Sequence, residues 1–252
     1  TSDGEGRGRH DESVRAGGHD KTGRAHGRQA GDYGIQLDRA GLYPAGGGQP
    51  GDAGVLRIAA GTGAGANAGA VVVIADTIHE KGTGLHLHVL ADGAPSLSVG
   101  DTVTAEIDWD RRFAHMRMHS GLHLLCAVID GGVTGGSIGA EKSRLDFDLP
   151  DTALDKVKIT ADLNRLVDED HPMAARWITD EELTANPDLI RTMSVRPPSG
   201  SGRVRLVEIA GVDLQPCGGT HVGRSGEIGK LRVGKIENKG KHNRRINLHF
   251  DE

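Results

Sequence analysis

Residues 110–130, DRRFAHMRMHSGLHLLCAVID, decide the fold of the second half of this chain. From Arg111 to Asp130 the segment contains one glycine, Gly121, and no proline. Its apolar side chains recur at helical spacing, with Asp110 as a candidate N-cap and two glycines after Asp130 as a stop signal. The sequence therefore predicts a long helix over 111–130.

The segments on either side of this helix predict an α+β fold in two domains. Before it, short β-branched or alternating runs at 55–59, 71–76, 85–89 and 103–107 predict a small β-barrel-like domain over residues 32–108. After it, residues 109–252 predict an α+β domain with the long helix packed on a mostly antiparallel sheet. In that domain we expect a glycine-rich turn before residue 144 and short helices near 161–169 and 180–192, the second broken at Pro187. We expect strands at 144–148, 156–159, 204–209, 230–237 and 245–250, and an extended segment at 172–178.

Composition limits the class of protein. Residues 1–31 are mostly Gly, Arg, His and Asp, which predicts a disordered or poorly anchored tail. A formal charge of -5 excludes a basic protein that coats nucleic acid nonspecifically, although it allows a local basic patch. The apolar runs are far shorter than a membrane helix needs. We expect no secretory signal peptide, and two cysteines are too few to stabilise a domain of this size by disulfide bonds. We expect a soluble, cytoplasmic protein with no membrane partner.

Two separated half-sites indicate a metal centre. His119 and His123 stand four residues apart in the predicted helix, so both imidazoles project from one face. Cys217 and His221 lie in a loop whose intervening two glycines allow a sharp turn. One thiolate and three imidazoles suit Zn²⁺, which accepts mixed nitrogen and sulfur donors. Cys126, on the apolar helix, fits a buried and unreactive thiol better.

The segments around these half-sites resemble a known family. Residues 117–125, RMHSGLHLL, and 213–222, DLQPCGGTHV, resemble the two zinc motifs of the AlaX family of alanyl-tRNA editing proteins, which are free-standing relatives of the alanyl-tRNA synthetase editing domain. Residues 42–52, LYPAGGGQPGD, resemble its glycine-rich motif, and further matches lie at 136–139, 142–147 and 239–246. The resemblance runs from about residue 33 to the end, in the family's order.

The resemblance implies an enzyme, a deacylase that hydrolyses the ester of tRNA(Ala) wrongly charged with serine or glycine. Such a hydrolase is needed because a pocket built for alanine cannot strongly exclude glycine or an analogue that adds one hydroxyl. Zinc would act near the scissile ester, and no ATP is expected. If all four ligands bind at once the site looks structural. Either His221 then stays loose, or the metal only positions the substrate while a separate water attacks.

The resemblance also assigns residues to the substrate pocket. Ser120 stands where relatives often carry Thr, and its hydroxyl is expected to contact the amino or hydroxyl group of the substrate. Gln49, in the glycine-rich motif, is expected to hydrogen-bond in the amino-acid pocket, and Ser137 to line the same pocket. The residues themselves also fit an exposed helix serine, an ordinary turn and a loop serine, respectively.

A basic segment near the end of the chain is a candidate nucleic-acid contact. Its net charge is positive, although the whole chain is negatively charged, and it follows the Cys217 loop in sequence. Phosphates of a tRNA acceptor stem are therefore its expected partner. The solvated face of an edge hairpin is the alternative. Its cations are Lys230, Arg232, Lys235, Lys239, Lys241, Arg244 and Arg245.

Two other functions compete with the alanyl-tRNA deacylase. A threonyl-tRNA-type editing domain is a related hydrolase, but the Gly-Gly-Gly-Gln and Cys-Gly-Gly-Thr-His segments favour the alanyl type. A zinc-stabilised tRNA-binding module without turnover belongs to another class. Measured release of serine from Ser-tRNA(Ala) separates them.

Overall fold

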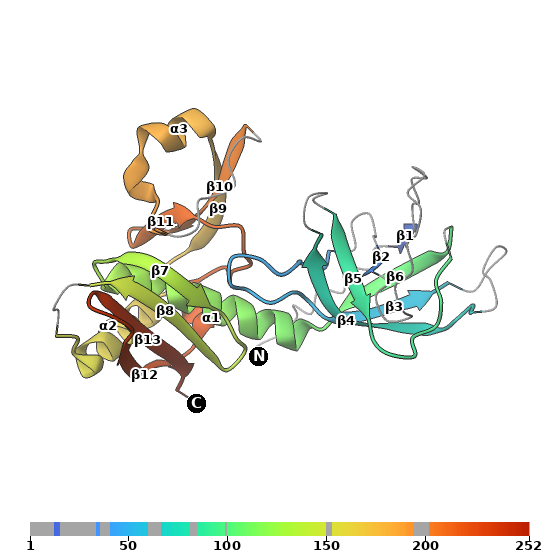
Figure 1. Cartoon of the computed structure of the whole chain (residues 1–252), viewed down its shortest axis with the longest axis horizontal. Coiled ribbons are helices and arrows are strands. Elements are labelled where there is room, and N and C mark those ends of the chain that lie inside the picture. Colours follow the sequence, from blue (N-terminus) through green and yellow to red (C-terminus); the bar gives the residue numbers. More distant parts are fainter. Residues whose placement is uncertain are drawn as a thin grey trace, which may run out of the picture. The chain divides into compact units, whose positions relative to one another are not determined.

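The chain forms two compact units, residues 1–45 with 51–109 and residues 46–50 with 110–252 (Figure 1). The computed structural model describes residues 13–15, 34–35, 41–59, 67–80, 85–98, 100–149, 153–193 and 202–251. Residues 46–50 pack with the second unit although the chain before and after them belongs to the first. No helix in the described ranges is long and apolar enough to cross a membrane.

The first unit is built on one antiparallel sheet in the order β1-β6-β3-β4-β5-β2. Alternate residues of β4 are buried, and Leu56, Val72, Ile74 and Val103 fill the core of the unit. This alternation is the period of two that the sequence predicted. The strands are β1 (Ser13–Arg15), β2 (Gly34–Ile35), β3 (Gly54–Ile58), β4 (Val71–His79), β5 (His86–Leu90) and β6 (Thr102–Ile107).

Two sequence predictions for this unit, the barrel and the disordered tail, are not shown by the described strands. β1 and β2 stand at the edges of the sheet, so the order of the described strands does not show the expected barrel. The predicted disordered tail, residues 1–31, lies outside the described residues except for Ser13–Arg15, which pair with β6 through Ser13 and Thr104.

The second unit combines one long helix with two antiparallel sheets. The four-stranded sheet has the order β12-β13-β8-β7, and the three-stranded sheet has the order β11-β10-β9. Its helices are α1 (Trp109–Val128), α2 (Lys156–Asp168) and α3 (Asp180–Ala185), and its strands are β7 (Gly132–Ser137), β8 (Lys142–Asp148), β9 (Met173–Thr179), β10 (Arg203–Ile209), β11 (Asp213–Pro216), β12 (Leu231–Asn238) and β13 (Asn243–Phe250). The 3₁₀ turns η1 (Pro187–Leu189) and η2 (Ser225–Ile228) complete it.

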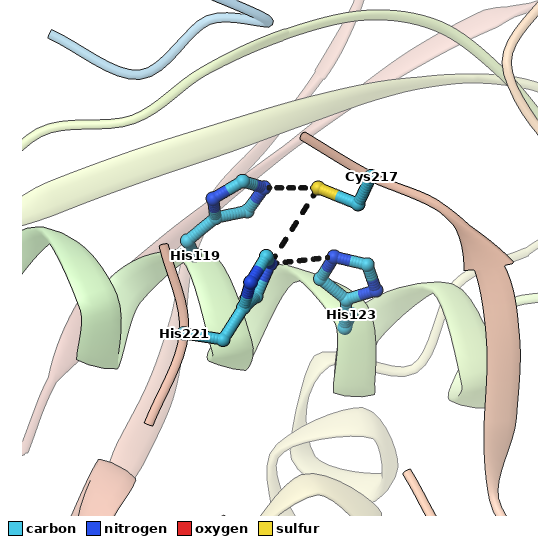
Figure 2. Close-up of side chains that lie close together, drawn as sticks. All are labelled: His119, His123, Cys217 and His221. Carbon is cyan, nitrogen blue, oxygen red and sulfur yellow. Dashed lines mark hydrogen bonds between the residues drawn. The ribbon is translucent and has the colours of Figure 1, made fainter. Parts of the chain in front are cut away.

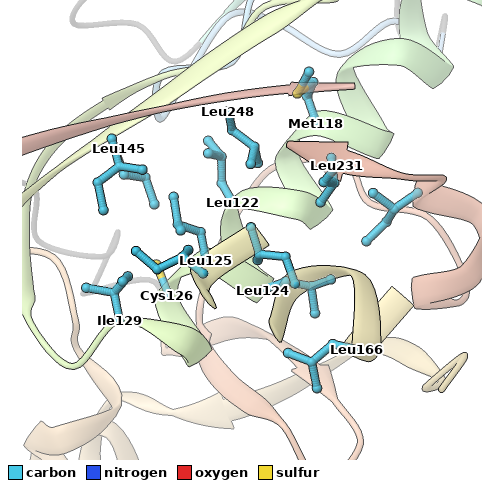
Figure 3. Close-up of a cluster of buried hydrophobic side chains, with 14 of the residues drawn as sticks. Met118, Leu122, Leu124, Leu125, Cys126, Ile129, Leu145, Leu166, Leu231 and Leu248 are labelled. Atoms are coloured by element: carbon cyan, nitrogen blue, oxygen red, sulfur yellow. The ribbon is translucent and has the colours of Figure 1, made fainter. Parts of the chain in front are cut away.

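Helix α1 is the centre of the second unit's core. Every residue from Met118 to Cys126 is buried, because one side of the helix packs on β12 and β13 while the other faces the three-stranded sheet. Met118, Leu122 and Leu125 lie among the side chains of the large apolar cluster (Figure 3). Gly121 lets the helix approach the sheet, since a Cβ there would lie 3.2 Å from Leu231 Cδ1 and 3.3 Å from Leu248 Cδ2.

The structure corrects several local predictions. Residues 156–159 were predicted as a strand but form the first turn of α2, because the Asp155 side chain accepts hydrogen bonds from the backbone N–H groups of Val157 and Lys158. The expected glycine-rich turn before residue 144 contains β7, which pairs with β8 despite three glycines. Asp110 lies in the first turn of α1, which begins at Trp109, and is not its N-cap. Strand β11 was not predicted.

Gly121→Ala tests the close approach of helix to sheet. Leu231 and Leu248 are fully buried, so we expect an overpacking cost of about 1–3 kcal/mol to exceed the roughly 0.5–1 kcal/mol that Ala gains over Gly in a helix. Urea unfolding of the variant then gives a lower free energy of unfolding than the unmodified chain. Val157→Ala, on α2 where the side chain is 79% exposed, is the control and changes stability by less than about 0.5 kcal/mol. Equal or greater stability of Gly121→Ala would contradict the packing argument.

Candidate metal centre

Four ligand side chains from two distant segments converge on one point. His119 and His123 lie one turn apart on α1, with ring centroids 5.3 Å apart, and both are buried. Cys217 directly follows β11, and His221 lies four residues further along the same loop. Figure 2 shows the three rings and the sulfur facing one another. Their ligand atoms all lie within 4.8 Å of one another, so these four residues could hold one metal ion.

The distances within the cluster are short. Cys217 Sγ lies 3.3 Å from His119 Nε2 and 3.5 Å from His221 Nε2. His221 Nε2 lies 3.1 Å from His123 Nε2. The Nε2 atom of every imidazole therefore points into the cluster. The predicted convergence of the thiol at residue 217 with the imidazoles at 119 and 123 is confirmed.

Glycine at position 219 is required by the approach of the loop to the helix. A Cβ there would lie 2.2 Å from His119 Cε1 and 2.9 Å from Gln49 Oε1. Arg205 of β10 holds the same turn from the other side, since its Nη1 donates to the carbonyl oxygens of Cys217 and Gly219 at 2.7 and 3.0 Å. The loop is thus clamped between α1 and the three-stranded sheet.

Gln49 fixes the orientation and the tautomer of His119. Its Oε1 accepts a hydrogen bond from the backbone N–H of Thr220 at 3.1 Å, so it is an acceptor and His119 Nδ1 must donate to it at 2.9 Å. Gln49 Nε2 donates to Thr220 Oγ1 at 2.8 Å. With its proton on Nδ1, a neutral His119 presents the lone pair of Nε2 to the cluster.

Asp213 does the same for His123. The carboxylate Oδ2 lies 3.2 Å from His123 Nδ1 and accepts a second hydrogen bond from Gln215 Nε2 at 2.7 Å. Only 1% of the Asp213 side chain is exposed. A carboxylate behind a metal-binding histidine orients the ring and makes it a stronger ligand. By contrast, the Nδ1 of His221 is buried and has no hydrogen-bond partner among the described residues.

The electrostatics of the cluster favour metal-binding forms of two ligands. Burial disfavours a thiolate at Cys217, but the proximity of His119 and the hydrogen bonds from the imidazoles lower the pKa of this thiol well below its ordinary value. Burial, and next the proximity of His119, lower the pKa of His221 to about 3, so its ring is neutral. A thiolate and a neutral imidazole are the forms that bind metal.

His123 retains its proton in the absence of an ion. Burial lowers its pKa, but hydrogen bonding to Asp213 and Cys217 outweighs this effect and raises the pKa to about 9. A metal ion replaces that proton when it binds. Cys126 differs from Cys217, since burial raises the pKa of its thiol to about 12, which agrees with the expected unreactive cysteine.

Two of the three predicted pocket residues contact the cluster or its loop, the third lies beside the glycine-rich segment, and their contact with a substrate stays a prediction. Gln49 is 2% exposed and faces His119, as described above. Ser120 is fully buried, and its Oγ accepts a hydrogen bond from the Val222 backbone at 3.2 Å, which ties the metal loop to α1. Ser137 is exposed at the end of β7, where the Ile138 N–H donates to the Gly48 carbonyl at 2.9 Å. The glycine-rich segment and Ser137 are therefore neighbours.

The predicted basic segment forms β12, β13 and the turn between them. Several of its cations face carboxylates: Lys230 lies 2.5 Å from Asp168 and Lys239 lies 3.0 Å from Glu237. Arg245 makes two hydrogen bonds, of 2.7 and 2.8 Å, to Asp146. Further pairs join Arg232 to Asp251 and Lys235 to Glu237, while Arg244 donates to backbone carbonyls and Lys241 is exposed.

Comparison with known proteins places this site in a family. Residues 204–247, which include Cys217 and His221, match the family described as the threonyl and alanyl tRNA synthetase second additional domain. The alanyl-tRNA editing protein AlaX-M of Methanosarcina acetivorans is 35% identical over 219 residues, which cover 84% of this chain and 86% of that protein. The chain belongs to the AlaX-M family of alanyl-tRNA editing proteins. The AlaX-M protein of Saccharolobus solfataricus is 32% identical over 225 residues, 87% of this chain and 89% of that one.

The same comparison relates this AlaX-M chain to much longer proteins. It is 34% identical over 217 residues to the alanine–tRNA ligase of Pyrobaculum calidifontis, a match that covers 81% of this chain but only 22% of the ligase. The predicted resemblance to the AlaX family, and to part of an alanyl-tRNA synthetase, is thus confirmed.

Sequence reasoning missed the residues that hold the ligands. Asp213 and Gln215 stand three positions and one position before the expected motif core Pro-Cys-Gly-Gly-Thr-His, and alternation along a strand would have placed both on one face. That signal requires β11 to be recognised, which its four residues made difficult. Arg205 and the Thr220 contacts gave no local signal, since they depend on pairing between distant segments.

Asp213→Asn tests the support of His123. The isosteric amide removes the negative charge behind the imidazole, so we expect metal affinity to fall about 10- to 100-fold. Competition with a chromophoric chelator measures this affinity in the reconstituted protein. Glu141→Gln, which neutralises an exposed carboxylate, is the matched control and leaves the affinity unchanged. An unchanged affinity in Asp213→Asn would remove Asp213 from the metal centre.

Proposed function

We propose that this AlaX-M chain is a zinc-dependent hydrolase that releases serine, or glycine, from wrongly charged tRNA(Ala). The observation that carries the proposal is the convergence of His119, His123, Cys217 and His221. The relatives named as alanyl-tRNA editing proteins support the substrate class, since they match this chain over most of their length. The soluble, cytoplasmic setting expected from composition agrees with a tRNA substrate.

The donor set and its spacing fit zinc. Tetrahedral Zn²⁺ with bonds of about 2.3 Å to sulfur and about 2.0–2.1 Å to nitrogen separates neighbouring ligand atoms by roughly 3.3–3.6 Å. Three of the separations between ligand atoms in the cluster are 3.1, 3.3 and 3.5 Å, and all of them are within 4.8 Å. Mixed thiolate and imidazole ligands also favour zinc over magnesium or calcium, which take oxygen. Bound zinc would supply a Lewis acid that polarises the ester carbonyl or lowers the pKa of a water.

The protein residues orient this chemistry unequally. Gln49 and Asp213 hold His119 and His123 through their outer nitrogens, whereas no described residue bonds the outer nitrogen of His221. With a metal ion bound, His119, His123 and Cys217 would be the permanent ligands. His221 would be the ligand that the protein holds least firmly, and so the one to make room for a substrate group or water.

The amino-acid pocket is proposed beside the glycine-rich segment. Gln49 borders it while orienting His119, and Ser137 is exposed next to Gly48. Ser120 shapes the pocket from α1, since its hydroxyl accepts a hydrogen bond from the Val222 backbone N–H and so fixes the residue that follows His221. A serine side chain, or a glycine that fills less space, would occupy this pocket.

The basic segment is proposed to contact phosphates of the acceptor stem. Most of its ion pairs are exposed, and exposed pairs contribute only about 0–1 kcal/mol, so phosphate can replace the carboxylates. Lys230, Arg232, Lys235, Lys239, Lys241 and Arg244 are the cations concerned. Arg245 stays engaged with Asp146 and would act by holding the hairpin.

Release of labelled serine from Ser-tRNA(Ala) tests the proposal. We expect turnover by the zinc-loaded protein, and a fall in kcat/KM of at least about 100-fold in His119→Ala, because the loss of several kcal/mol of charge stabilisation has that effect. His171→Ala, which removes a histidine paired with Glu169 outside the cluster, is the control and retains activity.

Each alternative function has its own outcome in this assay. Equal hydrolysis of Ser-tRNA(Thr) and Ser-tRNA(Ala) would favour a threonyl-type editing domain. Tight binding of tRNA without release of serine would leave a zinc-stabilised binding module. Turnover that survives complete removal of zinc would contradict a metal role in the reaction.

A further inference from the structure

An exposed tryptophan lies on the same sheet as the metal loop. Trp177 is in the edge strand β9, and 55% of its surface is exposed. The guanidinium of Arg203 lies over its ring, with Cζ 4.6 Å from the centroid. Exposed cation–π pairs contribute only about 0.5–1 kcal/mol, so stability alone gives little reason to expose so large an apolar ring. We call Trp177 and Arg203 the Trp177 surface.

Strand register connects the Trp177 surface to the metal loop. Trp177 pairs directly with Arg205 across β9 and β10, so both side chains project from one face of the sheet. Arg205 donates from this face to the carbonyl oxygens of Cys217 and Gly219. The tryptophan ring is thus one cross-strand step from the residue that clamps the metal loop.

The same face also carries the support of a metal ligand. Ile209 follows Arg205 by four residues on β10, and it pairs with Asp213 of β11. Asp213 in turn hydrogen-bonds His123. At one end of this face, Asp213 orients the metal ligand His123. At the other end, the same face presents the Trp177 ring with the guanidinium of Arg203.

The size and chemistry of the Trp177 surface indicate its ligand. Among the described residues of β9, β10 and β11, Trp177 is the only large hydrophobic side chain that is exposed. A protein partner requires an apolar area of hundreds of Å². A single ring beside a guanidinium suits one flat, unpaired nucleobase with a nearby phosphate, which proteins commonly recognise by stacking on aromatic rings and arginine.

We propose that Trp177 and Arg203 bind the 3′-terminal base of the tRNA whose amino-acid ester is presented to the metal loop. The proposal rests on the proposed function, because in an aminoacyl-tRNA the ester is carried by the ribose of the terminal nucleotide. The base attached to that ribose must lie close to the scissile ester, which matches the single cross-strand step from Trp177 to Arg205. Stacking there positions the ester and takes no part in bond breaking.

Fluorescence of Trp177 tests the binding of the base without any turnover. In a Trp109→Phe background, Trp177 is the only tryptophan of the chain. We expect an uncharged acceptor-stem minihelix that ends in CCA to quench its emission, and the same minihelix shortened to CC to leave it largely unchanged. Equal effects of the two minihelices, or no effect of either at concentrations that bind, would overturn the proposal. Quenching by an unrelated protein but by neither minihelix would assign the surface to a protein partner.

Kinetics with charged substrate provide the second measurement. Trp177→Ala should raise KM for Ser-tRNA(Ala) about 5- to 150-fold with little change in kcat, since stacking contributes about 1–3 kcal/mol per base. Trp177→Phe retains an aromatic ring, so its KM should stay close to that of the unmodified chain. If Trp177 had only a structural role, Trp177→Ala would also bind less metal. A wild-type KM in Trp177→Ala overturns the stacking role while hydrolysis itself stands. Selective quenching by CCA in a chain that hydrolyses no ester would instead refute the proposed function alone.

Discussion

The metal centre depends on hydrogen bonds to the Nδ1 atoms of His119 and His123, which point away from the cluster. An imidazole can bind a metal with one nitrogen only if the ring is held at the correct angle and the proton sits on the other nitrogen. Gln49 meets this requirement for His119, and Asp213 meets it for His123. These two partners come from a loop and a strand that are distant in sequence, so the metal centre forms only after both segments have packed against α1.

The sequence predicted the parts of this arrangement that depend on local spacing. The helix, its His119 and His123 pair, and the loop with Cys217 and His221 follow from periodicity and glycine placement, and the structure brings them together. Strand β7 and the first turn of helix α2 were missed. Glycines in β7 hid its pairing with β8, and β-branched residues at the start of α2 hid the cap that Asp155 supplies. Gln49 was assigned to the pocket from the resemblance of its glycine-rich motif, and nothing local indicated that it also faces His119.

The three-stranded sheet has a larger role than its size suggests. Its one face supplies Asp213 to the metal centre, Arg205 to the metal loop and Trp177 to solvent. This face holds the carboxylate that orients His123, the loop that carries two ligands and the Trp177 ring in fixed register, because strand pairing leaves no freedom to shift one relative to another. The position of a bound ester would then follow from the sheet, while the metal loop supplies the reactive groups.

In the proposed centre, one ion joins the helix to the loop through three imidazole nitrogens and one sulfur. X-ray absorption at the zinc edge of the reconstituted protein measures these ligands. We expect one sulfur at about 2.3 Å and nitrogens at about 2.0–2.1 Å, with the sulfur shell lost in Cys217→Ser. A shell of six oxygens, or a spectrum without sulfur in the unmodified protein, would contradict the proposed centre.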